Sequence, residues 1–170
     1  MVSEPAVAVR LARLRAEMTH DLSAMNARAG EISDLLGRWN TEGGLGRGEV
    51  IVMAVNLHGW YTALETILER VARLLDQSVP TGGAWHIDLI EQMQLDVPGV
   101  RQAALPSNVR PGLHELRKFR HFFRNAYVLE LDADLVRRRA LELSDVHGPI
   151  AESLTRLHAH VAATLAEVGR

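Results

Sequence analysis

Apolar residues recur every three or four positions along most of this chain, and that spacing places them on one face of an α-helix. The pattern is longest near the N-terminus, where it runs through Leu11, Leu14, Met18, Leu22, Met25, Ala29, Ile32, Leu35, Leu36 and Trp39. The one strand-like run, Val50–Val55, is shorter than the helical pattern that contains it. The sequence therefore predicts an all-α protein.

Glycine and proline divide this helical pattern into segments. The first helix is expected to end at residues 42–48, where four glycines favour a flexible connection. The later helices are expected over residues 49–77, 85–95, 113–129 and 132–143, followed by a last helix that Pro149 starts. Asp132 is the expected N-cap of the segment 132–143. Five or six helices with short connections favour a helical bundle.

The length of 170 residues predicts a single domain. We expect residues 49–168 to form the core bundle and residues 1–42 to form an N-terminal helical arm. The chain has no cysteine, which excludes disulfides and thiolate metal ligands and fits a reducing cytosol. Because no apolar run is long enough to span a bilayer and no signal peptide is visible, we expect a soluble, cytoplasmic protein without a membrane partner.

Positive charge is concentrated in one part of the chain. The formal net charge of −2 argues against a general nucleic-acid coat, because such proteins carry a large basic excess. Residues 110–139 nevertheless contain eight basic and four acidic side chains. Any contact with a nucleic acid is therefore expected to be local.

The helix expected over residues 113–129 carries a polar stripe, because residues three, four and seven positions apart share a helix face. The stripe consists of Arg117, Arg120, His121, Arg124 and Tyr127. Guanidinium groups grip phosphates through paired hydrogen bonds, imidazole titrates near neutral pH, and a phenol can stack on a base. The stripe indicates an anion site, and the alternative is a solvated helix face without a function.

Other polar residues have both structural and functional interpretations. His114 and His121 share a helix face, but no third ligand lies at a suitable spacing, so we expect no metal and no cofactor. His86 is expected either to pack inside the fold or to contribute to an RNA or partner surface. Glu65 and Tyr61, one turn apart on an apolar helix, are expected to form a buried hydrogen-bonded pair.

Residues 120–127 resemble the Arg-x4-His-x-Tyr motif of the HepT-like branch of the HEPN family. Arg120 is followed by four residues and then by Asn125, Ala126 and Tyr127, so Asn125 stands where the family has its histidine. Three further segments resemble HepT-like domains in order and spacing, namely residues 59–65, 79–83 and 85–93. The resemblance covers roughly residues 49–143.

The resemblance implies a HEPN-like helical bundle that acts as a metal-independent endoribonuclease, the toxin of a bacterial toxin–antitoxin pair. Two copies of the chain would form one cleft about a two-fold axis. In that cleft Arg120 would stabilise the charge on the reacting phosphate, while Arg117, Arg124 and Tyr127 would bind RNA such as tRNA or mRNA. The antitoxin that the family implies is a nucleotidyltransferase, which would adenylylate the motif tyrosine, here Tyr127.

Asn125 departs from the family motif in a way that affects the mechanism. An amide does not titrate, so Asn125 can donate or accept hydrogen bonds but cannot transfer a proton. Either His121 supplies the proton transfer, or this member is a weak or inactive nuclease. The alternative to an enzyme is then an interaction module that binds RNA, a nucleotide or the nucleotidyltransferase without cleavage.

Overall fold

The computed structural model describes residues 4–125 and 131–168, and within them it is almost entirely helical. Its α-helices are α1 (Glu4–Glu42), α2 (Arg47–Val71), α3 (Trp85–Met93), α4 (Arg110–Asn125) and α5 (Ala133–Val168). A π-helical turn (Ala72–Asp76) extends α2, and a 3-10 turn (Ser107–Val109) leads into α4. Because these ranges contain five α-helices and no strand, the predicted all-α bundle is confirmed.

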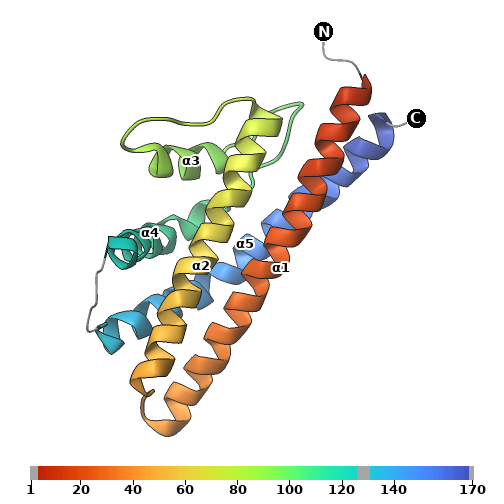
Figure 1. The fold of residues 1–170 in the computed structure, drawn as a ribbon. Helices are drawn as coiled ribbons and strands as arrows, with labels where there is room; N and C mark the ends of the chain where they lie inside the picture. The colour runs from red at the N-terminus through yellow and green to blue at the C-terminus, as the bar shows by residue number, and fades with distance from the viewer. Residues whose placement is uncertain (1–3, 126–130, 169–170) are drawn as a thin grey trace.

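Helices α1, α2 and α5 are the long members of the bundle, and α1 packs against both of the others (Figure 1). Helix α4 packs on α2 and α5, and α3 packs on α2. In Figure 1, α3 and α4 lie on the side of α2 that faces away from α1. This arrangement places α4, the helix with the basic stripe, against the middle of α2.

The apolar pattern of the first helix forms a large part of the core. Leu14, Met18, Met25 and Ile32 are completely buried and belong to the same cluster as Trp60 of α2. Burial of a side chain of this size contributes roughly 1.5–3 kcal/mol, which explains why a helix of such length stays docked along the bundle. None of the helices in the described ranges is long and apolar enough to cross a membrane.

The glycine-rich connection between α1 and α2 is short, since α1 ends at Glu42 and α2 begins at Arg47. Gly43 and Gly44 have φ angles of +76° and +149°, which residues with a Cβ rarely adopt. The backbone N–H of Gly46 donates to Oε2 of Glu49 at 3.0 Å, which satisfies one of the free amides at the start of α2. The prediction that the first helix ends in this segment is confirmed.

The last two predicted helices are one helix, so the prediction that Pro149 starts a new helix is wrong. Asp132 does cap α5, since its Oδ1 accepts from the backbone N–H of Asp134 at 2.9 Å and of Leu135 at 3.2 Å. Pro149 lies inside α5, although a proline there lacks the N–H that a helix interior uses. The apolar stripe continues past it through Val146, Ile150, Leu154 and Leu157, all buried, and their packing holds the helix together.

A buried ion pair fixes the long connection between α3 and α4. The Arg101 guanidinium donates to both carboxylate oxygens of Asp76, at 2.7 and 2.6 Å, and its side chain is completely buried. It also donates to the backbone carbonyls of Leu95 at 2.9 Å and Gln92 at 3.2 Å. Arg101 therefore joins the connection to the π-helical turn and to the end of α3.

Candidate functional site

One face of α2 supplies polar side chains to the junction with α4. His58, Thr62 and Glu65 are four and three residues apart, so they lie on one stripe of α2. Glu65 is buried, and His58 and Thr62 are partly buried. The stripe is polar although α2 is otherwise the main apolar helix, so these side chains need partners from the neighbouring helices.

Glu65 holds residues from two other helices. Its Oε1 lies 3.0 Å from Nη2 of Arg120 on α4, and its Oε2 lies 2.6 Å from Nδ1 of His86 on α3. Arg120 also directs Nε toward the Thr62 hydroxyl at 3.4 Å, and its guanidinium carbon lies 5.8 Å from the centre of the Tyr61 ring. Arg120 is therefore fixed by its surroundings before any ligand arrives.

Tyr61 and Glu65 are both buried, as predicted, but Glu65 makes its polar contacts with His86 and Arg120. Burial raises the pKa of the Tyr61 phenol well above its usual value, and the nearby Glu65 carboxylate raises it further. Tyr61 therefore stays neutral at physiological pH. Its role beside Arg120 is to provide an aromatic surface for the cation.

His58 lies one turn before Thr62 on α2. Of the three polar residues His58, Thr62 and Glu65, it is the one nearest the start of that helix. Its ring centre is 5.4 Å from that of Phe123, which α4 contributes. Burial lowers the pKa of His58, and the positive charges of Arg120, Arg124 and Arg28 lower it further. Its Nδ1 is shielded from solvent and has no hydrogen-bond partner among the described residues.

The other predicted site residues lie along α4 with different exposures. Arg117 has a buried Nε that lacks a partner among the described residues, whereas His121 and Arg124 are exposed. Asn125, the last residue of α4, is also exposed, and its Nδ2 donates to the His121 carbonyl at 2.7 Å. Tyr127 lies outside the described residues.

Two hollows in the described surface differ in their distance from the basic stripe. One, of about 410 Å³, lies between α3 and α4 and is lined by Ile87, Ile90, Arg110, Pro111, His114 and Arg117. It adjoins the stripe at Arg117 and has a basic rim. It therefore extends the site from Arg120 toward α3.

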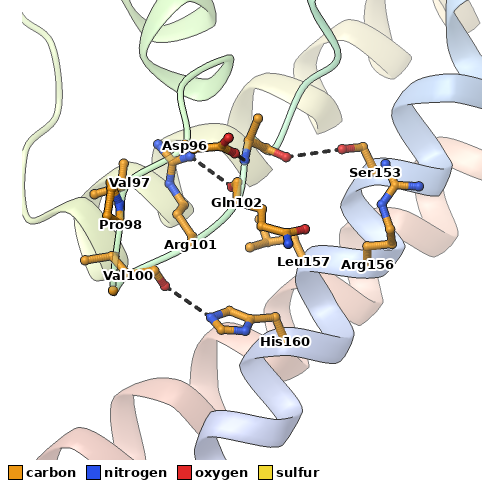
Figure 2. Close-up of a pocket in the computed structure, with 12 residues that line it drawn as sticks. Asp96, Val97, Pro98, Val100, Arg101, Gln102, Ser153, Arg156, Leu157 and His160 are labelled. Atoms are coloured by element: carbon orange, nitrogen blue, oxygen red, sulfur yellow. Dashed lines mark hydrogen bonds between the residues drawn. The ribbon is translucent and has the colours of Figure 1, made fainter.

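The larger hollow, of about 560 Å³, lies between the 96–103 loop and α5 (Figure 2). Its polar groups hold the loop in place, because the Ser153 hydroxyl donates to the Ala103 carbonyl at 3.3 Å and His160 contacts the Val100 carbonyl at 3.1 Å. Figure 2 shows no residue of α4 among those that line it. We therefore assign the candidate site to the junction of α2 and α4.

The described residues contain no group of three or more histidine, cysteine, aspartate or glutamate side chains that could hold a metal ion. His114 lines the hollow between α3 and α4, whereas His121 is exposed near the end of α4. The chemistry available at the junction is therefore that of guanidinium, imidazole, hydroxyl and carboxylate groups.

Sequence reasoning missed His58 and Thr62 of α2 at the junction, and also Arg28 of α1, whose charge lowers the pKa of His58. The spacing of His58 from Thr62 and Glu65 was a usable signal, because three polar residues on one stripe of a core helix need a common explanation. Arg28 has no comparable signal, since it comes from α1 and reaches the junction through the packing of that helix.

Comparison with known proteins gives one match. The family model described as HepT-like protein matches residues 52–161, which is more than half of the chain and includes α3, α4 and most of α2 and α5. Neither the curated proteins nor the solved structures contain a match to the chain.

Proposed function

The chain belongs to the HepT-like protein family, and from this premise we propose that it is the toxin of a bacterial toxin–antitoxin pair and an endoribonuclease that needs no metal ion. The observation that carries the proposal is the fixed position of Arg120 at the centre of the junction, between Glu65 and Thr62. The Arg120 side chain keeps 15% of its surface exposed, so a ligand can reach it. Because the proposed substrate is bacterial RNA, we expect the activity to be in the cytoplasm.

The proposed reaction is an internal transesterification of RNA. The 2′-oxygen forms a bond to the adjacent phosphorus while the bond from phosphorus to the 5′-oxygen breaks, which leaves a 2′,3′-cyclic phosphate and a 5′-hydroxyl. A proton leaves the 2′-hydroxyl and another reaches the 5′-oxygen, so no proton is consumed overall. Arg120 stabilises the negative charge that develops on the non-bridging oxygens.

Proton transfer in this scheme falls to His121, because Asn125 cannot titrate. His121 is exposed, lies one turn before Asn125, and its carbonyl accepts the Asn125 side chain at 2.7 Å. Arg117 and Arg124 bind phosphates on either side of the reacting one, since they lie three and four residues from Arg120. Neither of them pairs with a carboxylate among the described residues.

The proposed active form is a homodimer, in which a second copy of the chain covers the junction of α2 and α4 and completes the cleft. Ile51, Val52 and Val55 of α2 are 43, 48 and 47% exposed, and their spacing continues the stripe of His58 and Thr62. An apolar patch beside a polar site is typical of an interface. A two-fold arrangement of this patch brings two copies of the site together.

The proposed antitoxin is a nucleotidyltransferase that adenylylates Tyr127. Tyr127 belongs to the stripe predicted from the sequence, three residues after Arg124, so the modification adds negative charge and bulk to the predicted RNA-binding stripe and blocks access of RNA. Mass spectrometry after co-expression of the two proteins tests it. Added adenylyl mass that persists in Tyr127→Phe contradicts Tyr127 as the acceptor.

RNA binding without cleavage is the second candidate function, and Asn125 is the observation that favours it. A cleavage assay on total RNA and on tRNA separates the two candidates. The parent chain is compared with Arg120→Ala, with Asn125→His, and with Arg156→Ala as a matched control, because Arg156 is an exposed arginine of α5. Cleavage that depends on Arg120 supports the nuclease, and binding without cleavage in both the parent chain and Asn125→His supports the binding module.

A further inference from the structure

Arg28 of α1 lies directly across the backbone of α2 at Gly59. A Cβ at residue 59 would lie 2.5 Å from the guanidinium carbon of Arg28, so only glycine leaves room for the side chain in this position. Nη1 of Arg28 also donates to the Asn56 side-chain oxygen at 3.4 Å. The side chain of Asn56 also binds Glu31, because its Nδ2 donates to Oε2 of Glu31 at 2.7 Å.

The guanidinium of Arg28 thus lies over the backbone of α2 at Gly59, the residue that follows His58. The Nδ1 of His58 is shielded and has no hydrogen-bond partner among the described residues, and its ring centre lies 5.4 Å from that of Phe123, which precedes Arg124 on α4. Burial lowers the pKa of His58, and the positive charges of Arg120, Arg124 and Arg28 lower it further. On its own helix the nearest acidic residue of the stripe is Glu65, which is already paired with Arg120 and His86. No carboxylate among the described residues forms an ion pair with Arg28 or Arg124.

A group of positive charges without a matching carboxylate attracts an anion. Arg28 is partly buried and pinned, His58 is partly buried, and Arg124 is exposed, so the group is open on the side of α4. Two arginines with fork-shaped donors and one imidazole match the oxygens of a phosphate group.

We infer that Arg28, His58 and Arg124 form a second phosphate site, which binds the RNA backbone beside the phosphate at Arg120. The inference rests on the proposed function, because it takes RNA as the ligand. It assigns a role to α1, which lies outside the family match. Burial and then the neighbouring arginines oppose protonation of His58 in the free protein, and a bound phosphodiester favours it, so ligand binding is coupled to proton uptake.

The inference is tested by binding of a single-stranded 2′-deoxy oligonucleotide, which has no 2′-hydroxyl to react, to the full chain at several salt concentrations. Arg28→Gln should weaken binding roughly tenfold or more and lower the slope of log K against log salt by about 0.7 to 1. Binding to the parent chain should become tighter between neutral pH and about pH 5, since phosphodiesters do not titrate in that range and His58 does. His58→Gln should make that pH dependence weaker than in the parent chain.

Gly59→Ala provides a variant in which no charge is lost. The new methyl group should displace the Arg28 side chain, whereas alanine favours the helix by up to about 1 kcal/mol, so the protein should stay folded. Weaker oligonucleotide binding at unchanged or higher thermal stability supports the inference. Inorganic phosphate, used as a second probe, should show the same order of affinities among the variants if a single phosphate suffices for binding.

The outcomes separate this inference from the nuclease proposal. If the parent chain cleaves RNA and Arg28→Gln, Gly59→Ala and His58→Gln all bind and cleave as it does, the second phosphate site is wrong and the nuclease stands. If the parent chain cleaves nothing but these variants lose binding, the site stands and the nuclease is wrong. If the parent chain does not bind the oligonucleotide, the second phosphate site is wrong, and the cleavage assay alone decides the nuclease proposal.

Discussion

Glu65 on α2 and Arg120 on α4 form an ion pair at 3.0 Å in which the two side chains are only 8 and 15% exposed. Glu65 is the fixed partner in this pair, because His86 Nδ1 contacts its other oxygen at 2.6 Å. Removing one partner of this pair lowers the stability of the fold, because the remaining charge is buried and few water molecules can reach it. The pair therefore joins the stability of the bundle to the position of the motif arginine.

We predict that Glu65→Ala lowers the free energy of unfolding by about 2 to 4 kcal/mol, because it leaves Arg120 shielded and unpaired. The double variant with Arg120→Ala should cost less than the sum of the single changes, with a coupling energy above about 1 kcal/mol. Urea denaturation of the four proteins measures this cycle. Additive single effects would show that the two residues do not interact.

Arg101 and Asp76 are expected to matter for stability alone. Arg101→Met should lower the free energy of unfolding by about 3 to 5 kcal/mol, because the Asp76 carboxylate is left buried without its partner. Arg156→Ala, which removes an exposed arginine paired with Glu152, should change it by less than about 1 kcal/mol. Equal effects of the two changes in urea denaturation would contradict the assignment.

Much of the fold follows from the sequence because helical periodicity and glycine placement are local signals. The spacing along residues 11–39 identifies the buried face of α1, and the glycines of residues 42–48 identify its end. Pro149 misleads because a proline usually stops a helix, and only the packing of the residues around it shows that α5 continues.

The candidate site could be predicted in part for the same reason. The basic stripe on α4 is a local pattern, whereas the partners of Arg120 come from α2 and depend on how two helices meet. The position of Arg28 depends on the packing of α1 over Gly59, which no short motif encodes. Sequence reasoning thus finds the motif helix but not the side chains that surround it.

The stability of the protein should fall as the pH drops below about 6.5, the usual pKa of histidine. Burial lowers the pKa of His147 and of His58 in the folded state, so the unfolded chain binds protons first. The loss begins near the unfolded pKa and is complete once the pH is below the folded pKa values. His147 Nδ1 accepts from Trp60 Nε1 at 3.1 Å, a bond that a protonated ring cannot make.

Urea denaturation at pH 8, 6.5 and 5.5 measures this dependence. In His147→Gln the fall in stability should be smaller, since glutamine offers an acceptor oxygen to Trp60 that does not titrate in this range. His20→Gln serves as the control, because His20 is an exposed residue of α1. The same fall in all three proteins would show that His147 is not one of the groups responsible.

The exposed apolar residues of α2, Ile51, Val52 and Val55, are the proposed contact surface of the homodimer. If Val55 is buried between two copies of the chain, its removal from the contact costs roughly 1.5 to 3 kcal/mol for each copy, and a charge in its place costs more. Each substitution counts twice in a two-fold dimer, so Val55→Lys should raise the dimer dissociation constant by about a hundredfold or more.

Val9→Lys is the matched control, because Val9 is an exposed valine of α1 away from the site. Light scattering should show a dimer for the parent chain and for Val9→Lys at micromolar concentration, and a monomer for Val55→Lys. If Val55→Lys remains a dimer, the interface lies elsewhere on the molecule, and a parent chain that is monomeric without its antitoxin rules out the shared cleft.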